Sequence, residues 1–189
     1  IYERLGGVTF KLGLLTFFQT NTAQAECMLE VVREFAALRG TERVADVYCG
    51  VGTFALALAG QADQVIGIES LPAAAEAARE NAVLNGITNA TFHTAVAADL
   101  QWVLAPYSRL DAVILDPPRA GAGVVVMRAI GTLAPPRVVY VSCNPTTLAS
   151  DLRELQRWGY AVTAIQPLDL FPHTPHVECV VQLERITGA

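Results

Sequence analysis

Cys143 stands where an apolar run stops and a helix start follows. The run over residues 138–141 is Val-Val-Tyr-Val, and Ser142-Cys143-Asn144-Pro145 comes directly after it. Asn and Pro in these positions favour the N-cap and the first turn of a helix. A thiol beside a helix N-terminus lies near N–H groups that favour the thiolate, which is the nucleophilic form. The residues therefore leave two interpretations: a reactive thiol, or a buried and inert cysteine.

Two further segments place polar groups after predicted strands. Asp116-Pro117-Pro118-Arg119 follows an apolar run, and its consecutive prolines stiffen the loop. The segment Tyr48-Cys49-Gly50-Val51-Gly52-Thr53-Phe54 joins a strand to a helix, where glycines allow a tight turn and the close approach of a ligand. Glu69 ends the next strand, where a carboxylate can accept hydrogen bonds from ribose hydroxyls. The pattern suits an adenosine cofactor but fits a nicotinamide motif only weakly, and each loop alone could be a plain turn.

An alternation of strands and helices has to position these groups. Strands are predicted over residues 44–48, 64–69, 90–94, 110–115, 137–141, 160–167 and 177–184, and helices over 22–38, 53–59, 72–84 and 146–158. Asn21 and Gln24 fit a capping box for the first helix, and Gly40 fits its stop. This order is typical of a doubly wound α/β domain with a parallel sheet. The glycine loop, Asp116 and Cys143 should then meet at one sheet edge.

Composition limits the class of protein. The chain has 189 residues, of which 52% are hydrophobic, and this is enough for one well-packed domain. No apolar run reaches the length of a membrane span and no signal peptide is evident, so we expect a cytoplasmic protein without a membrane partner. The net charge of −5 argues against a broad basic surface for a polyanion. The four cysteines contain no C-x-x-C pair, which argues against zinc and iron–sulfur sites.

Two further segments lie near the ends of the chain. Residues 1–15 look like short β pieces around Gly6, Gly7 and Gly13, and the first residue is Ile, so we take residues 1–20 as a lead-in from a preceding subdomain and 21–189 as the main domain. The loop over residues 169–178 contains His173, His176 and Glu178. No third or fourth ligand accompanies the histidines, so we expect a hydrogen-bonded loop and no metal, with Glu178 near the same sheet edge.

Several motifs in order resemble one family, the S-adenosylmethionine-dependent RNA uracil-5-methyltransferases that make 5-methyluridine in tRNA and 23S rRNA. The resemblance covers residues 17–183. Its motifs are Phe-Gln-Thr-Asn at 18–21, Asp-Val-Tyr-Cys-Gly-Val-Gly-Thr-Phe at 46–54, Ile-Gly-Ile-Glu at 66–69, Asp-Pro-Pro-Arg-Ala-Gly at 116–121, Tyr-Val-Ser-Cys-Asn-Pro at 140–145 and Phe-Pro-His-Thr-Pro-His-Val-Glu at 171–178. The resemblance implies a Rossmann-like class I methyltransferase fold, a mostly parallel seven-stranded sheet with helices on both faces and an antiparallel C-terminal strand.

The resemblance also implies roles for individual residues. Cys143 would add to C6 of the target uracil, and Glu178 would remove the C5 proton. Asp116 would contact the uracil edge and the reactive end of the cofactor, and Gln19 would lie near both. The implied cofactor is S-adenosyl-L-methionine, released as S-adenosyl-L-homocysteine. Its shell would comprise Gln19, Tyr48, Gly50, Thr53, Glu69, Asp99 and Asp116, with Glu69 on the ribose and Asp99 near the adenine.

The sequence departs from the family pattern in three respects. Thr53 replaces an asparagine common in the rRNA branch, and Asp99 lies in a loosely aligned segment. Full-length relatives also carry an N-terminal RNA-binding β-barrel and a further subdomain, sometimes with an iron–sulfur cluster, and these residues do not include them. Missing phosphate-contacting parts would explain the acidic balance. The target base would have to be splayed or flipped to reach Cys143.

Three alternatives remain, and the partner is RNA in the first two. An RNA cytosine-5-methyltransferase carries a cysteine in its proline-rich loop, whereas Arg119 follows Asp116-Pro117-Pro118 here. An amino-group methyltransferase would not need Cys143 or Glu178. A cofactor-binding fragment without activity of its own is the third. The sequence predicts no protein partner, and a monomer is the default expectation.

Overall fold

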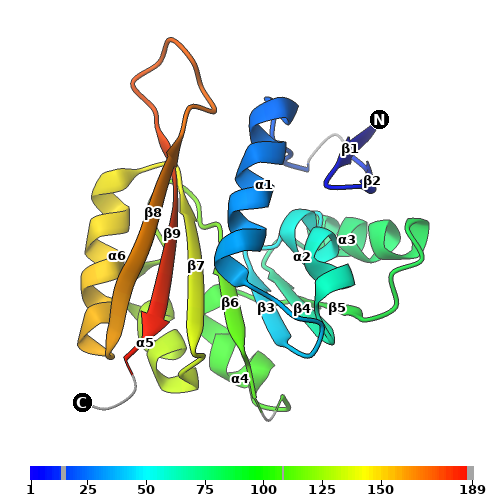
Figure 1. The fold of residues 1–189 in the computed structure, drawn as a ribbon. Coiled ribbons are helices and arrows are strands. Elements are labelled where there is room, and N and C mark those ends of the chain that lie inside the picture. The colour runs from blue at the N-terminus through cyan, green and yellow to red at the C-terminus, as the bar shows by residue number, and fades with distance from the viewer. Residues whose placement is uncertain (14–15, 108, 187–189) are drawn as a thin grey trace.

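The sheet that the sequence predicts is present in the computed structural model, which describes residues 1–13, 16–107 and 109–186. Its seven strands lie in the order β5-β4-β3-β6-β7-β9-β8 (Figure 1). They are β3 (Arg43–Val47), β4 (Gln64–Glu69), β5 (Ala90–Thr94), β6 (Ala112–Leu115), β7 (Arg137–Ser142), β8 (Tyr160–Leu168) and β9 (Glu178–Arg185). The strands from β5 to β7 pair in parallel, whereas β9 runs antiparallel to both β7 and β8. The predicted fold class is confirmed.

Helices cover both faces of the sheet (Figure 1). One face carries α1 (Thr22–Ala36), α2 (Thr53–Leu58) and α3 (Pro72–Leu84), and the other carries α4 (Leu100–Leu104), α5 (Gly123–Leu133) and α6 (Pro145–Arg157). The central strand β6 supplies both cores, because successive side chains of a strand point to opposite faces. Ala112 and Ile114 belong to the first core, and Val113 and Leu115 belong to the second.

The first helix begins as predicted but ends earlier. The Asn21 side chain accepts a hydrogen bond from the Gln24 backbone N–H at 3.3 Å, as an N-cap should. The buried face of α1 includes Met28, Leu29 and Val32 at helical spacing. The helix stops at Ala36, because Ala37 adopts a left-handed conformation with φ of 45° and donates its N–H to the Arg33 carbonyl. The prediction that Gly40 forms the stop is therefore wrong.

Three helical elements, α5, α4 and the short 3-10 helix η2 (Ala97–Asp99), are absent from the sequence-based prediction. Helix α5 contains Val124-Val125-Val126, a β-branched run that favours a strand by propensity alone. It is helical because Met127 and Ile130 bury against the second core together with Val126, and this burial outweighs propensity. The 3-10 helix η2 and α4 also lie on that side.

The N-terminal segment forms an antiparallel hairpin of β1 (Tyr2–Leu5) and β2 (Val8–Lys11). Its turn needs glycine at Gly6, where φ is +60° and an added Cβ would lie 2.2 Å from a methyl carbon of Leu29. Asn85 ties the hairpin to α3, because its side chain exchanges two hydrogen bonds with the Thr9 backbone at 2.9 and 2.7 Å. Leu14 and Leu15 of the predicted lead-in, and residues 187–189, lie outside the described residues. The domain boundary at residue 20 stays a prediction.

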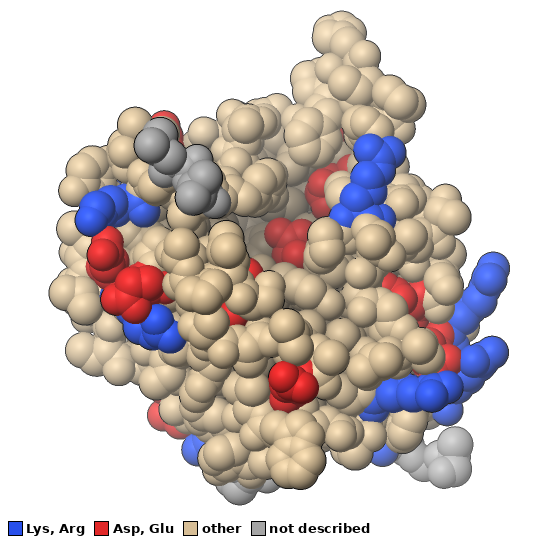
Figure 2. Space-filling model, turned by 180° about the vertical axis from the view of Figure 1, so that it is seen from behind, with Lys and Arg blue, Asp and Glu red and all other residues tan. Residues whose placement is uncertain are grey.

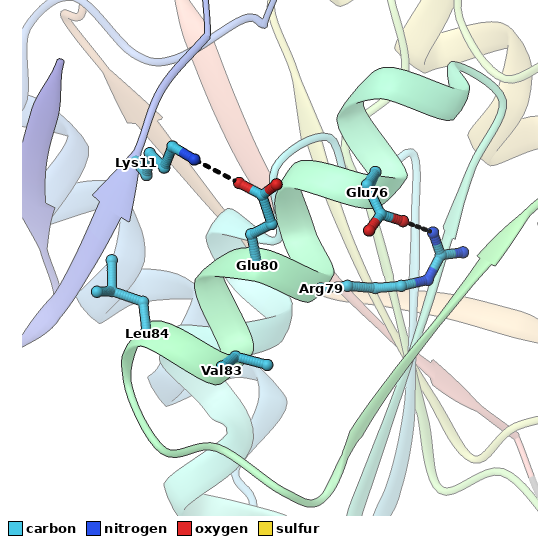
Figure 3. A pocket seen from close by; sticks show the side chains of 6 residues that line it. All are labelled: Lys11, Glu76, Arg79, Glu80, Val83 and Leu84. Atoms are coloured by element: carbon cyan, nitrogen blue, oxygen red, sulfur yellow. Dashed lines mark hydrogen bonds and ion pairs between the residues drawn. The ribbon is translucent and has the colours of Figure 1, made fainter.

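A shallow surface pocket lies between this hairpin and α3 (Figure 3). An ion pair of 2.8 Å joins Lys11 to Glu80 across it, and a second pair joins Glu76 to Arg79 within the helix. Val83 is 82% exposed beside them. None of the residues that line this pocket belongs to the predicted site.

Among the described helices, none is both long and apolar enough to traverse a bilayer.

Candidate active site

The carboxyl ends of four neighbouring parallel strands hold most of the predicted site. The glycine loop follows β3, Glu69 ends β4, Asp116 follows β6, and Cys143 follows β7. These strands are adjacent in the order β4-β3-β6-β7, so the loops that leave them lie side by side. Open parallel sheets bind their ligands at this edge. The sequence correctly predicts that these groups converge.

Glu178 reaches the same edge because β9 runs in the opposite direction. Glu178 is the first residue of β9 and lies where the parallel strands end. Next to it, Cys179 is paired with Ser142 in the β7–β9 ladder. Continuing that register by one residue places Cys143 opposite Glu178. Cys143 is partly exposed, whereas Glu178 is only 4% exposed. The thiol is thus accessible and the carboxyl beside it is shielded from water.

The glycine loop is shaped and held by Glu69. One carboxylate oxygen of Glu69 accepts a hydrogen bond from the Gly50 N–H at 3.0 Å, and the other accepts one from the Leu71 N–H at 2.8 Å. Tyr48 enters the loop with φ of 68°, which is unusual for a residue with a side chain. Among the described residues other than its two chain neighbours, no atom lies within 4 Å of where a Gly50 Cβ would point, so the backbone there is open to a ligand.

A cavity brings predicted residues from three segments together. The residues that line it are Phe17, Phe18, Gln19, Tyr48, Cys49, Gly50, Thr53, Phe54 and Asp116. Gln19, Tyr48, Gly50, Thr53 and Asp116 are all predicted members of the cofactor shell. The face in Figure 2 is hollowed near its centre, and acidic side chains lie in and beside the hollow.

Asp99 is the exception among the predicted residues. It ends η2 after β5 and is not among the residues that line the cavity. Its predicted place near an adenine therefore remains a prediction.

The sequence reasoning overlooked Asp46. This residue is 0% exposed in β3, and one of its oxygens accepts a hydrogen bond from the Ala55 N–H at 2.8 Å. Its other oxygen, Oδ1, is buried without a hydrogen-bond partner in the described part of the chain. Burial raises the pKa of Asp46 to about 8, and Asp116 and Glu69 add to the rise. An aspartate inside an apolar strand, directly before the glycine loop, was the available signal.

Burial also changes the pKa values of the Cys143 thiol and of the two carboxyls that act on it. It raises the pKa of Asp116 to about 7. It raises the pKa of Glu178 to about 8, with a further contribution from Asp116. The Cys143 thiol has a pKa above its ordinary value because of burial first, then the charges of Glu178 and Asp116. A backbone hydrogen bond and Arg119 act in the opposite direction but are outweighed.

A backbone hydrogen bond does act toward the Cys143 thiolate, as the sequence suggests, but the net pKa of the thiol in the protein alone is raised. Helix α6 does begin as predicted, because the Asn144 side chain accepts a hydrogen bond from the Thr146 N–H at 3.1 Å. Two carboxyls and a low-dielectric environment outweigh that helix end.

The β8–β9 loop projects beyond this edge of the sheet (Figure 1). His176 lies 3.3 Å from the Arg119 guanidinium and packs edge-on against the Phe171 ring. Across the described residues, no cluster of three or more His, Cys, Asp and Glu side chains is arranged to hold a metal ion. The loop thus connects to the Asp116 segment through Arg119.

The chain matches the family model described as tRNA (Uracil-5-)-methyltransferase over residues 8–186. It is 49% identical to an uncharacterized RNA methyltransferase of Porphyromonas gingivalis, and the match covers 99% of this chain and 41% of that protein. The chain therefore spans about two fifths of the length of the curated relatives that it matches.

Solved structures agree with this match. The Pyrococcus abyssi tRNA (uracil-54, C5)-methyltransferase, solved in complex with S-adenosyl-L-homocysteine, is 39% identical with a TM-score of 0.85, over 97% of this chain and 44% of that one. M. jannaschii TYW2, solved in complex with AdoMet, is 21% identical with a TM-score of 0.69, over 98% of this chain and 86% of that one. The second likeness concerns the fold alone.

The raised pKa of Glu178 predicts how stability depends on pH. Folded protein keeps a proton on Glu178 up to about pH 8, whereas an ordinary glutamate has a pKa of 4.5. Between these values the folded state binds more protons, so the free energy of unfolding falls as pH rises. We therefore compare the free energy of unfolding of Glu178→Gln with that of the parent protein. The difference in favour of the variant should be larger at about pH 8 than at about pH 5, by on the order of 1 to 3 kcal/mol.

Urea unfolding at the two pH values measures this difference. Glu184→Gln is the matched control, because Glu184 lies exposed near the other end of the same strand. Equal pH dependence of Glu178→Gln and the parent protein would contradict the assignment of a buried, protonated Glu178.

Proposed function

The chain belongs to the tRNA (uracil-5-)-methyltransferase family, and from this we propose that it catalyses transfer of a methyl group from S-adenosyl-L-methionine to C5 of a uridine in RNA. One observation supports the proposal most strongly. The register of β7 and β9 sets the Cys143 thiol opposite the Glu178 carboxyl, beside Asp116 and the cavity lined by Gln19. A nucleophile and a base thus lie next to a glycine loop of the kind that binds nucleotide cofactors. Methylation of an unactivated ring carbon requires both groups beside the methyl donor.

Cys143 addresses the chemical difficulty of the reaction, which is that C5 of uracil is a poor nucleophile. Addition of the Cys143 sulfur to C6 breaks the C5–C6 double bond and places the electron pair on C5 and the O4 carbonyl. The carbon that results can form a bond to an electrophilic methyl group. The raised pKa of the thiol means that it must lose its proton during substrate binding or addition.

Glu178 completes the sequence after the methyl group is in place. Its carboxylate removes the C5 proton, the electron pair reforms the C5–C6 double bond, and the Cys143 sulfur leaves C6. A general base works best when its pKa is near the working pH, and burial brings that of Glu178 to about 8. Asp116, which is partly exposed in the cavity, provides a hydrogen-bonding group for the uracil edge and holds the pKa of Glu178 up.

The residues around the glycine loop fit the implied cofactor. The open backbone at Gly50 leaves space for a ligand, and the carboxylate of Glu69 beside it is an acceptor that a polar, cationic ligand would use. When bound, S-adenosyl-L-methionine supplies a methyl group on a positively charged sulfur. Gln19, Tyr48, Thr53 and Asp116 would surround it in the cavity, and we propose Asp99 as a more distant member of the same shell.

The RNA class is the open part of the proposal, and both tRNA and 23S rRNA remain candidates. The net charge of −5 offers little attraction to phosphates. We therefore propose that other parts of the full-length protein provide most phosphate contacts. The target base must leave its stack to reach Cys143.

Covalent trapping tests the role of Cys143. Full-length protein incubated with the cofactor and 5-fluorouridine transcripts of tRNA and of 23S rRNA should form an adduct that survives denaturing electrophoresis, because fluorine replaces the C5 hydrogen and the sulfur cannot leave. Cys143→Ala should form none, while Cys27→Ala, at an exposed cysteine, should behave like the parent protein. An adduct with Cys143→Ala would overturn the nucleophile assignment, and the transcript that is trapped identifies the RNA class.

The role of Glu178 predicts a different outcome with ordinary uridine RNA. Glu178→Gln should still add to C6 and accept the methyl group, but it cannot remove the C5 proton. Mass spectrometry should then detect RNA linked to protein and carrying the added methyl group. Glu184→Gln serves as the control. Normal turnover by Glu178→Gln would remove its role as the base.

Glu69 is expected to govern cofactor affinity. Loss of its carboxylate removes a ribose acceptor and releases the Gly50 N–H, so Glu69→Ala should weaken binding of S-adenosyl-L-homocysteine at least about tenfold, or 1.4 kcal/mol. Isothermal titration calorimetry measures this. Glu76→Ala, at an exposed helical position nearby in sequence, is the control. Unchanged affinity of Glu69→Ala would contradict the ribose contact.

A further inference from the structure

A buried aspartate on α6 holds the far end of the Asp116 loop. Asp151 is 5% exposed, and its two carboxylate oxygens accept three hydrogen bonds. Oδ2 accepts from the Ala122 N–H at 2.8 Å and from the Tyr140 hydroxyl at 2.6 Å, and Oδ1 accepts from the Gly123 N–H at 3.1 Å. The Asp151 carboxylate therefore joins β7, α6 and the loop that leads into α5.

The same loop is attached to α6 at a second point, next to the thiol. The Arg119 carbonyl accepts hydrogen bonds from the Asn144 side chain at 3.1 Å and from the Thr147 hydroxyl at 3.3 Å. Asn144 directly follows Cys143 in the chain. The segment over residues 116–123 is thus fixed at its middle and at its end to the helix that begins after the nucleophile.

Gly121 makes this close approach possible. Its φ is +82°, and an added Cβ would lie 2.9 Å from Asp151 Oδ2 and 3.1 Å from Thr147 Cβ. Both the backbone conformation and the lack of space exclude a side chain here. The glycine of the Asp-Pro-Pro-Arg-Ala-Gly motif is explained by contact with Asp151 and not by ligand binding.

Asp151 also lies within electrostatic range of the glycine loop. Burial raises the pKa of Tyr48 to about 12, with a further contribution from the charge of Asp151. The pKa of Tyr140 is raised by burial and then by its hydrogen bond to Asp151. The carboxylate therefore sits behind the loops that hold Asp116, Cys143 and the predicted cofactor shell, without lining the cavity itself.

We propose that Asp151 is a positioning residue that locks the Asp116 loop to the β7–α6 turn, so that Asp116 and Cys143 face one uracil at a fixed separation. This inference rests on the proposed function. Correct placement of reacting groups contributes strongly to rate, and a displacement of about 1 Å can cost about 100-fold. A purely structural alternative exists, because Asp151 also accepts the first N–H groups of α5 and would stabilise that helix as a cap.

Asp151→Asn separates the two roles. An amide cannot accept all three hydrogen bonds, because its NH2 group must face one of the present donors. We expect adduct formation with the 5-fluorouridine transcripts, at saturating RNA, to slow roughly 10- to 100-fold. Cofactor affinity measured by calorimetry should change less than about twofold, since Glu69 and Gly50 are untouched. Asp63→Asn, at an exposed position before β4, is the matched control and should match the parent rate.

Tyr140→Phe provides a second, milder variant. It removes one donor to Asp151 and leaves the bonds to Ala122 and Gly123 in place, so a smaller slowing is expected. Should Asp151→Asn not fold, slowing by Tyr140→Phe with unchanged cofactor affinity supports the proposal, and an unchanged rate overturns it.

The remaining outcomes are distinct. A lower melting temperature of Asp151→Asn with a parent-like adduct rate well below that temperature would show a cap alone and sink the positioning role. Absence of any adduct with the parent protein would instead refute the proposed function on which the inference rests.

Discussion

The direction and register of β9 are the constraint on which the site depends. Parallel strands alone deliver the glycine loop, Asp116 and Cys143 to one edge, but a carboxyl opposite the thiol requires a strand that starts there. The antiparallel pairing of β9 with β7 meets this requirement, with Ser142 opposite Cys179. A slip by one residue would turn Glu178 to the other face of the sheet. The fully buried side chains of Val180, Val181 and Leu183 resist such a slip, because they occupy both cores.

Grouping carboxyls in a shielded site has an electrostatic consequence. Asp46, Asp116 and Glu178 all have pKa values raised by burial, and each of Asp46 and Glu178 is raised further by Asp116. The folded protein therefore tolerates these groups best when they are protonated. Functional sites often keep such unfavourable arrangements, because perturbed pKa values are what acid and base chemistry near neutral pH uses.

Much of the fold and site could be predicted because the signals are local. Glycines after a strand, prolines after Asp116 and a capping asparagine after Cys143 each report their own surroundings. The overlooked features depend on tertiary contact instead. Helix α5 contains a β-branched run that only burial makes helical, and the pKa of Cys143 follows from carboxyls distant in the sequence. Asp151 reads as an ordinary helical residue until its partners on β7 and the Asp116 loop are known.

The raised pKa of the Cys143 thiol follows from its burial and from the carboxyl groups near it. With its proton in place, Cys143 is a weak nucleophile and resists oxidation, because both reactions need the thiolate. Glu178 and Asp116 sustain that state, and Arg119 opposes it only weakly. A positively charged ligand beside Asp116 would lower the pKa of every acidic group near it. Entry of a sulfonium cofactor would therefore favour the Cys143 thiolate and the Glu178 carboxylate together, which are the forms that their proposed roles require.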